Sequence, residues 1–412
     1  MSVTRRGVLA GGAAIAAAAG TGARRARAAT PVIKVGVLTD LSGPYRDING
    51  PNGFACAKQA AAEFMAANPG IKVEVIAGDH QNKPDVGVGI LRGWYDNEGV
   101  DMVTDLTNSA VALACSAISV EKDRVCMVTA GGSSALTGSA CNANTVHWTY
   151  DSWNNAHVTG TAVTKLGADS WFFVTPNYSY GRAIQGDATK AIERAGGKVL
   201  GSAVYPFPET TDFSAMLLQA QSAGAKAVAF GVGGTDFVNL MKQSHEFGLN
   251  RSARLVGMTG FITDILGMGP NVAQGTLLAE NFYWDMNDRT RGWTARVRPA
   301  LSAGAVPNSM QAGNYAATLH FLKAVKEMGP EKAKGAGRET VAAMKRMPTE
   351  DDCFGKGLIR VDGRKIHPSF LFQVKAPDAI KTPGAVYDLV STTPAEEAFR
   401  PLSEGGCKLV QG

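Results

Sequence analysis

Residues 33–45, IKVGVLTDLSGPY, carry the pattern that decides the fold of this chain. The apolar run Ile33–Leu38 ends abruptly at Ser42-Gly43-Pro44, and an alanine-rich helical pattern over residues 52–67 follows. A second apolar run starts at Lys72. Strands that alternate with helices in this way are typical of a parallel sheet with helices on both faces.

This alternation occurs twice along the chain. The first series ends with the strand pattern Val125–Thr129, and the second begins at Ser170–Thr175 and ends at Arg254–Met258. A chain of 412 residues exceeds what one hydrophobic core normally holds. We therefore predict an α/β protein with two Rossmann-like lobes.

The last part of the chain carries too few elements for a third lobe. We expect helices over Asn308–Glu327 and Glu339–Lys345, and a hairpin of Gly357–Val361 with Ser369–Val374 around Asp362-Gly363. These elements should complete the two lobes, so the chain must cross between them more than once.

The N-terminal segment, MSVTRRGVLAGGAAIAAAAGTGARRARAA, has the features of an export signal. Arg5 and Arg6 precede an apolar stretch that is too short and glycine-rich to span a bilayer, and Ala26-Arg27-Ala28 has the small-x-small pattern of a cleavage site. The segment resembles a twin-arginine signal. An ordinary secretory signal that contains an arginine pair is the alternative. We expect residues 1–28 to be removed and the protein to reach the periplasm.

The formal charge of +5 belongs to this N-terminal segment. Its removal would take five of the 41 Lys and Arg residues and leave 36, the same number as Asp and Glu. A neutral mature chain gives no support for binding to nucleic acid or to an anionic membrane.

The sequence holds no catalytic or cofactor motif. It lacks a GxSxG elbow, a P-loop and HExxH, and Gly231-Val232-Gly233-Gly234 lacks the third glycine of a dinucleotide loop. The six histidines have no ligand spacing. We expect no enzyme activity, no cofactor and no metal.

The six cysteines include no CxxC pair, and export to an oxidising compartment allows disulfides. Cys141 lies in a Gly/Ser/Asn loop and Cys407 lies near the C-terminus, so both are more accessible than the others. We expect a bond between these two that ties the tail down.

Ligands of parallel sheets bind beyond the carboxyl ends of the strands. In this chain the segments that follow the predicted strands are rich in Ser, Thr, Asn, Gly and Tyr. Such residues can hydrogen-bond a small polar molecule and provide aromatic walls. These segments are 40–45, 79–83, 107–110, 130–134, 177–181, 231–236 and 259–261.

The chain resembles type I periplasmic solute-binding proteins of ABC importers, in the branched-chain amino acid (leucine/isoleucine/valine) binding group. The resemblance covers nearly all of residues 31–412. It is carried by IKVGVLTDLSGPY (33–45), DHQNKPD (79–85), TNSAVALA (107–114), VHWTYDSW (146–153), YSYG (178–181), FYWDMND (282–288) and FGKGLIRVDGRKIH (354–367).

The resemblance implies two lobes that close on a ligand by hinge motion, and a membrane permease and ATPases as partners of a monomeric protein. It implies three crossovers, which we place near Trp148–Trp153, Phe282–Met286 and Asp352–Leu358. The first lobe would then comprise residues 29–149 plus 286–351, and the second lobe residues 150–285 plus 352–412.

The resemblance also implies ligand contacts. The loops after the third and fourth strands would offer backbone NH groups and hydroxyls to a ligand carboxylate. The first loop would contribute Tyr45 and also Asp47, the first loop of the second lobe would contribute Tyr180, and residues 233–236 would include Asp236. The residues of the third and fourth loops are Asn108, Ser109, Ala110, Gly131, Gly132 and Ser133.

One departure from the family pattern bears on the ligand. Amino-acid binders of the family present an acidic residue to the ligand ammonium at a place where this chain has Thr259-Gly260-Phe261. A buried ammonium without an anion is costly. We therefore expect an aromatic or short organic carboxylate that stacks on tyrosines. An amino-acid ligand, or a sensor subunit with the same fold, is the alternative. The aromatic candidates are Tyr45, Tyr150, Tyr180, Tyr283 and Trp284.

Overall fold

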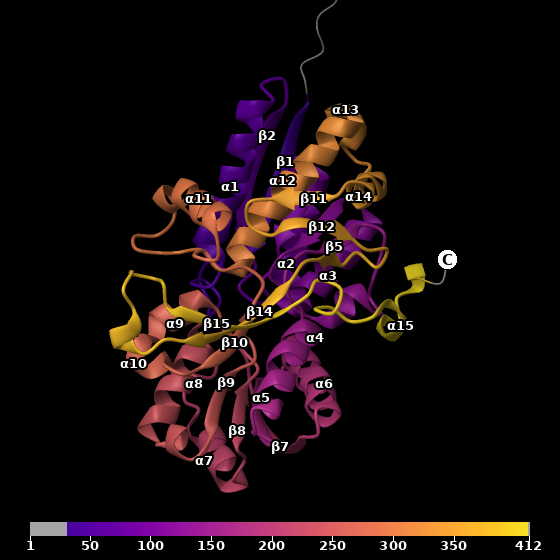
Figure 1. Cartoon of the computed structure of the whole chain (residues 1–412). Coiled ribbons are helices and arrows are strands. Elements are labelled where there is room, and N and C mark those ends of the chain that lie inside the picture. The colour runs from indigo at the N-terminus through magenta and orange to yellow at the C-terminus, as the bar shows by residue number, and fades with distance from the viewer. Residues whose placement is uncertain (1–30, 411–412) are drawn as a thin grey trace, which may run out of the picture.

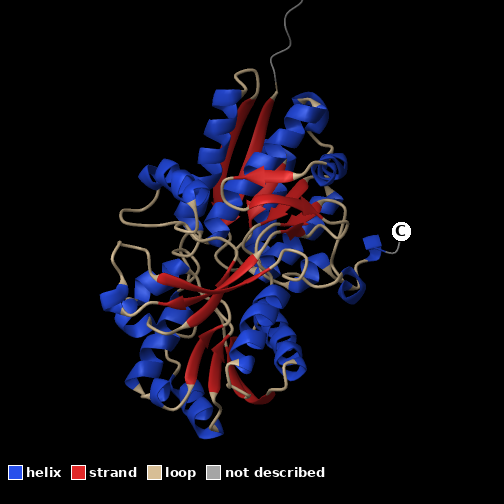
Figure 2. Cartoon of the chain, in the orientation of Figure 1, coloured by secondary structure: helices blue, strands red, loops and turns tan. Residues whose placement is uncertain are grey.

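The computed structural model describes residues 31–410, so the export signal predicted at residues 1–28 lies outside the described residues. Two lobes, each with its own sheet, lie one above the other in Figure 1. Helices flank the sheets in both lobes (Figure 2). No helix within residues 31–410 is long and apolar enough to cross a membrane. The predicted α/β class with two Rossmann-like lobes is confirmed.

The first sheet is parallel throughout and has the order β2-β1-β3-β4-β5. Its helices α1 and α12 contact each other, and so do α2 and α3. The strands are β1 (Val32–Thr39), β2 (Lys72–Asp79), β3 (Met102–Asp105), β4 (Val125–Val128) and β5 (Thr145–His147). The helices are α1 (Gly50–Ala67), α2 (Pro84–Gly93), α3 (Ser109–Glu121), α11 (Asp288–Val297), α12 (Ser309–Met328), α13 (Pro330–Ala333) and α14 (Gly337–Arg346).

The second sheet has the order β15-β14-β10-β9-β8-β6-β7. Strands β6 to β10 are parallel, and β14 and β15 extend the sheet in antiparallel fashion. The strands are β6 (Ser170–Pro176), β7 (Lys198–Tyr205), β8 (Ala227–Phe230), β9 (Arg254–Gly257), β10 (Leu277–Glu280), β14 (Ser369–Val374) and β15 (Tyr387–Thr393). The helices are α4 (Ser152–Asn155), α5 (Thr161–Lys165), α6 (Ser179–Arg194), α7 (Ser214–Ala223), α8 (Thr235–Glu246), α9 (Ile262–Met268), α10 (Pro270–Ala273) and α15 (Leu402–Gly405).

Burial explains the local structure around β6 and α6. Strand β6 is buried along its whole length because it lies between β7 and β8 in the sheet and because α6 and α7 pack against it. Helix α6 buries Ile184, Ala188 and Ile192, which recur every four residues on one face. The turn between them is therefore fixed at both ends, and it places Tyr178 and Tyr180 at the carboxyl end of the parallel strands.

The hairpin predicted from residues 357–361 and 369–374 is wrong. Strand β12 (Gly355–Ile359) pairs instead with β11 (Thr349–Asp351) and with the short β13 (Lys365–Ile366). Strand β14 joins the second sheet because Leu371, Phe372 and Val374 are buried there. Sequence periodicity identified the strands but could not tell which neighbour each strand would find.

Strand pairing also bears on where the chain crosses between the lobes for the third time. A bridge joins Arg364 to His147 at the end of β5, and β14 belongs to the second sheet. We infer that the third crossover lies between residues 366 and 369 rather than at 352–358. The exact lobe boundaries stay a prediction.

The C-terminal segment runs from β15 in the second sheet to the first lobe. Arg400 donates from Nη2 to the carbonyl of Ser134 at 2.8 Å. A disulfide joins Cys141 and Cys407, the pair expected from the sequence, with Cα atoms 5.6 Å apart. The cysteines at positions 56, 115, 126 and 353 are buried and free.

Candidate functional site

A small cavity lies where the loops after the strands of both sheets meet. Its volume is about 10 Å³, so the two lobes are closed around it and a ligand can enter only if they separate. The first lobe contributes residues that follow β1, β3 and β4, Tyr150 follows β5, and the second lobe contributes residues that follow β6, β8 and β9. The lining consists of Tyr45, Ile48, Thr107, Ser109, Gly132, Tyr150, Tyr178, Tyr180, Gly233, Thr259 and Phe261.

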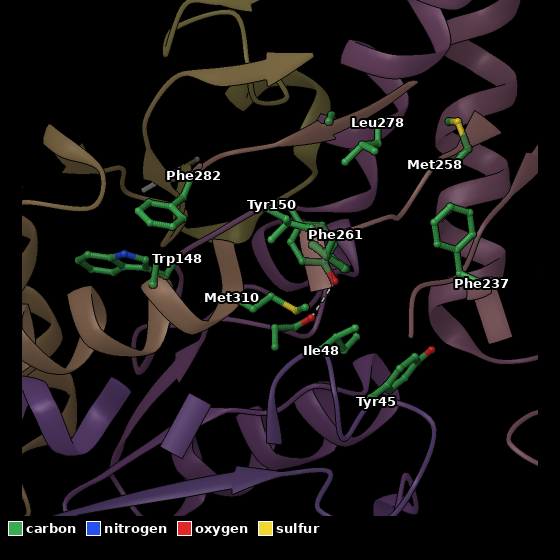
Figure 3. Packing of buried hydrophobic residues seen from close by; sticks show 14 of the residues in the cluster. Tyr45, Ile48, Trp148, Tyr150, Phe237, Met258, Phe261, Leu278, Phe282 and Met310 are labelled. Carbon is green, nitrogen blue, oxygen red and sulfur yellow. Dashed lines mark hydrogen bonds between the residues drawn. The ribbon is translucent and has the colours of Figure 1, made fainter. Parts of the chain in front are cut away.

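Aromatic rings form the walls of this cavity. The rings of Tyr150 and Phe261 contact each other with centroids 5.3 Å apart (Figure 3), and the edge of Tyr150 meets Tyr180 at 6.5 Å. Gly132 faces both tyrosines: a Cβ atom there would lie 2.6 Å from Tyr150 and 2.7 Å from Tyr180. Only a glycine allows the loop after β4 to approach the rings this closely.

The tyrosine hydroxyls are paired within the site. The hydroxyls of Tyr45 and Tyr178 lie 2.7 Å apart, and those of Tyr180 and Thr259 lie 2.5 Å apart. Tyr150 donates to the carbonyl of Ala130 at 3.0 Å. Burial raises the pKa of Tyr180 above its usual value, although the hydroxyl of Thr259 opposes the shift. The phenols are therefore neutral, and each of the two hydroxyl pairs keeps one proton that can be donated to an anion.

The loop after β3 delivers the N-terminus of α3 to the cavity. Asp105 and Leu106 have φ angles of 81° and 61°, which non-glycine residues rarely adopt. Asp105 is held by Thr107, whose hydroxyl donates at 2.5 Å, and by the amide of Asn314 at 2.9 Å. Ser109 opens α3, and helix N-termini attract negative charge.

The lining contains no charged side chain. Asp264 lies near the cavity, but its carboxylate accepts from the amides of Gly234 at 3.1 Å and Phe261 at 3.0 Å. Asp236 accepts from the hydroxyl of Tyr205 at 3.0 Å, and burial raises its pKa to about 6. Both acids support the loops and do not line the cavity.

Seven of the residues expected at the site line this cavity: Tyr45, Ser109, Gly132, Tyr150, Tyr180, Gly233 and Thr259. Four others support it from behind. Asn108 caps α3 by accepting from the amides of Ala110 and Val111, and the amide of Ser133 donates to the hydroxyl of Ser109. Gly131 precedes Gly132 in the same loop.

Four expected residues lie elsewhere. Tyr283 packs on Phe372 and Tyr387 of the second sheet, and Trp284 donates from Nε1 to the carbonyl of Gly384 at 2.9 Å. Asp236 supports its loop as described. Both aromatic residues lie beside the second crossover, where packing alone accounts for them. Asp47 pairs with Arg46 at 3.4 Å on the surface.

Other lining residues have weaker signals in the sequence. Tyr178 and Phe261 lie in the loops that were singled out, and no sequence feature distinguished them as site residues. Ile48 was not expected to line the site, because an apolar residue in a loop is usually explained by packing. Its position beside the cavity depends on the turn between β1 and α1, which also places Tyr45.

A larger hollow of about 550 Å³ lies between α6 and the C-terminal segment. Its rim carries exposed side chains of both signs, among them Lys190, Arg194 and Glu404. It lies away from the carboxyl ends of the strands. The small cavity between the lobes is therefore the better candidate for the functional site.

Comparison with known proteins agrees with the fold. The family model described as periplasmic binding protein matches residues 32–379. The chain belongs to this family, the type I periplasmic binding proteins of ABC transporters. The predicted family is thus confirmed, and membership implies a periplasmic location.

Three solved structures illustrate the relationship. A periplasmic binding protein from Burkholderia mallei is 36% identical, with 92% of this chain and 99% of that chain covered and a TM-score of 0.87. A branched chain amino acid ABC transporter periplasmic ligand-binding protein from Burkholderia xenovorans is 34% identical, with coverage of 92% and 99% and a TM-score of 0.79. An ABC transporter solute-binding protein from R. palustris in complex with benzoate is 20% identical, with coverage of 92% and 100% and a TM-score of 0.78, and shows a shared fold.

Proposed function

We propose that this chain is the exported substrate-binding component of an ABC importer and that it captures a small aromatic or short organic acid between its lobes. The observation that carries this proposal is the composition of the lining: four tyrosines and a phenylalanine, two threonines and a serine, and no charged side chain. Rings can stack on an aromatic ligand, and hydroxyls can hydrogen-bond a carboxylate.

The ligand carboxylate is expected at the N-terminus of α3. The partial positive charge of this helix end favours an anion there, and so does the hydroxyl of Ser109, which accepts from the amide of Ser133 and keeps its own proton free to donate. The ring of the ligand would lie against Tyr150, Tyr180 and Phe261. Because the closed cavity is small, the lining side chains must move apart to admit a ring.

An amino acid of the branched-chain type is the second candidate, since the Burkholderia xenovorans relative is named for such a transporter. An amino acid would bring an ammonium group, which needs an anion when buried. Neither Asp264 nor Asp236 lines the cavity, and Thr259 stands where the family presents an acid. These contacts favour the acid over the amino acid.

A thermal-shift screen of the mature protein tests the ligand class. Benzoate and 4-hydroxybenzoate, propionate, and leucine with valine represent the three classes. We expect at least one of the acids to raise the melting temperature and the amino acids to leave it unchanged. If only the amino acids stabilise the protein, the argument from Thr259 is wrong.

Two matched variants connect such binding to the cavity. Tyr150→Ala removes a ring from the lining, whereas Tyr283→Ala removes a ring that packs on the second sheet. The first variant should lose the ligand-induced shift and the second should keep it. If Tyr283→Ala loses the shift and Tyr150→Ala keeps it, the site would instead lie beside the second crossover.

The remaining parts of the proposal concern export and partners. We propose that the twin-arginine segment directs export, that the permease and ATPases of an importer recognise the closed lobes, and that the protein works as a monomer. Replacing Arg5 and Arg6 with lysines should retain the precursor in the cytoplasm. Loss of uptake of the ligand on deletion of the gene would support import, whereas unchanged uptake with a lost transcriptional response would support the sensor alternative.

A further inference from the structure

Phe207 lies in the segment between β7 and α7 and does not line the cavity. Its ring nevertheless stacks on two residues that do. The centroid of Phe207 is 5.1 Å from that of Tyr45, with the planes inclined by 30°, and 5.0 Å from that of Tyr178, inclined by 17°. We call Tyr45, Phe207 and Tyr178 the three-ring cluster.

The three-ring cluster joins the two lobes. Tyr45 follows β1 of the first sheet, whereas Phe207 and Tyr178 follow β7 and β6 of the second sheet. The hydroxyls of Tyr45 and Tyr178 close the cluster at 2.7 Å. Separation of the lobes would break both the contact between Tyr45 and Phe207 and this hydrogen bond, because each joins opposite lobes.

A second contact beside the cluster shows how closely the lobes approach. The amide of Thr235, at the start of α8, donates to the carbonyl of Pro44 at 3.0 Å. Gly234 precedes it with φ of 72°, and a Cβ atom there would collide with the same carbonyl. The residue before Tyr45 is thus also fixed to the second lobe when the site is closed.

We propose that Phe207 is a positioning residue that holds the closed state and thereby determines how long the site retains its ligand. Phe207 acts through Tyr45 and Tyr178, since its own ring is outside the lining. The inference rests on the proposed function as a binding protein whose lobes open and close. It adds a residue that neither the family resemblance nor the motif loops indicate.

Phe207 should affect ligand release because of the state in which its contact with Tyr45 exists. The stacking on Tyr45 is present only when the lobes are closed, so it slows opening and does not affect the encounter with an open site. Aromatic contacts of this kind stabilise by an amount that corresponds to roughly a tenfold change in an equilibrium or rate. The effect should therefore fall on ligand dissociation.

Stopped-flow kinetics with 4-hydroxybenzoate test this inference. Phe207→Ala should raise the dissociation rate about tenfold and leave the association rate within about threefold of the wild type. Phe207→Leu keeps apolar bulk and guards against a folding defect. Its dissociation rate should lie between those of the wild type and Phe207→Ala. The control is Phe247→Ala, which removes a partly exposed ring in the same lobe. Equal dissociation rates in Phe207→Ala and the control would overturn the proposal.

A second experiment needs no ligand and separates this inference from the proposed function. In the background Pro44→Cys with Thr235→Cys, oxidised glutathione should trap the closed state as a disulfide, because the two backbones meet there. Adding Phe207→Ala should slow trapping about tenfold, and adding Phe247→Ala should leave it within about twofold. If none of benzoate, 4-hydroxybenzoate and propionate binds, the proposed ligand class fails. Equal trapping rates would overturn the role of Phe207 whatever the ligand is.

Discussion

The hydroxyl of Tyr180 lies 2.5 Å from the hydroxyl of Thr259. Tyr180 follows β6 and Thr259 follows β9, and β8 lies between these two strands in the sheet. The pair thus occupies the place where amino-acid binders of the family present an acid, according to the resemblance. Here the tyrosine finds a neutral partner, which leaves the cavity lining without a carboxylate.

The two tyrosines of the loop after β6 should differ in their effect on binding. Tyr180→Ala removes a wall and the hydroxyl paired with Thr259, so we expect the affinity for 4-hydroxybenzoate to fall about a hundredfold. Tyr178→Ala should weaken it about tenfold, since Tyr178 acts mainly through the three-ring cluster. Isothermal titration calorimetry measures both. Small and equal losses would remove this loop from the site.

Thr259 should control the choice between acids and amino acids. Thr259→Glu places a carboxylate beside the cavity, where it can pair with an ammonium and repel a carboxylate. We expect the ratio of the affinity for leucine to that for benzoate to rise by at least about tenfold. Thr259→Gln, which has the same length without the charge, is the matched control. A similar ratio in both variants would contradict an electrostatic role.

The buried ion pair between Arg364 and Asp151 should be important for stability. Arg364 Nη1 lies 3.0 Å from Asp151 Oδ2, and the exposed fractions of the two side chains are 0% and 2%. Asp151→Ala leaves the guanidinium without its anion, so the free energy of unfolding should fall by about 3–5 kcal/mol. Urea denaturation measures this loss.

The exposed pair of Lys226 and Asp169, 2.8 Å apart, provides the control for that experiment. Asp169→Ala should change the free energy of unfolding far less than Asp151→Ala does, because solvent screens both charges. If the two variants lose similar stability, burial of Arg364 does not carry the effect.

Glu280 should make stability depend on pH. Burial raises its pKa from 4.5 to about 7, although the amides of Ile262 and Ser309 oppose the shift. Between these values the unfolded chain loses the proton first, so a rise in pH favours unfolding. The contribution of Glu280 should therefore decrease from pH 4.5 to pH 7 and stay constant above.

The variant Glu280→Gln isolates this contribution. The stability of the wild type minus that of the variant should be up to about 3 kcal/mol lower at pH 7 than at pH 4.5. Denaturation at several pH values measures the difference, and other titrating groups cancel between the two proteins. A difference that is constant with pH, or that rises, would contradict the raised pKa.

Much of the fold could be predicted because its signals are local. The runs at 33–38 and 170–175 became β1 and β6, and the apolar face at 184–192 became α6, since period and burial act within one element. The rule that ligands bind at the carboxyl ends of strands also located the loops of the cavity. Residues such as Tyr45, Ser109 and Tyr180 followed from these loops and from the resemblance.

Contacts between distant segments could not be predicted in the same way. Strand β14 pairs with β10 rather than with β12, because the choice depends on which buried surface is available after the lobes form. Tyr283 and Trp284 were expected at the site for their aromatic character, yet they pack beside the second crossover. A side chain's chemistry does not say which of several nearby surfaces will bury it.

The sequence by itself determined the alternation of strands and helices, the polar loops at the strand ends and the lack of an acid at Thr259. Only the tertiary structure decided that Tyr45 meets Tyr178 and that Phe207 stacks on both. These rings come from separate lobes and lie far apart along the chain. Their contact depends on the closure of one lobe on the other, which no local pattern encodes.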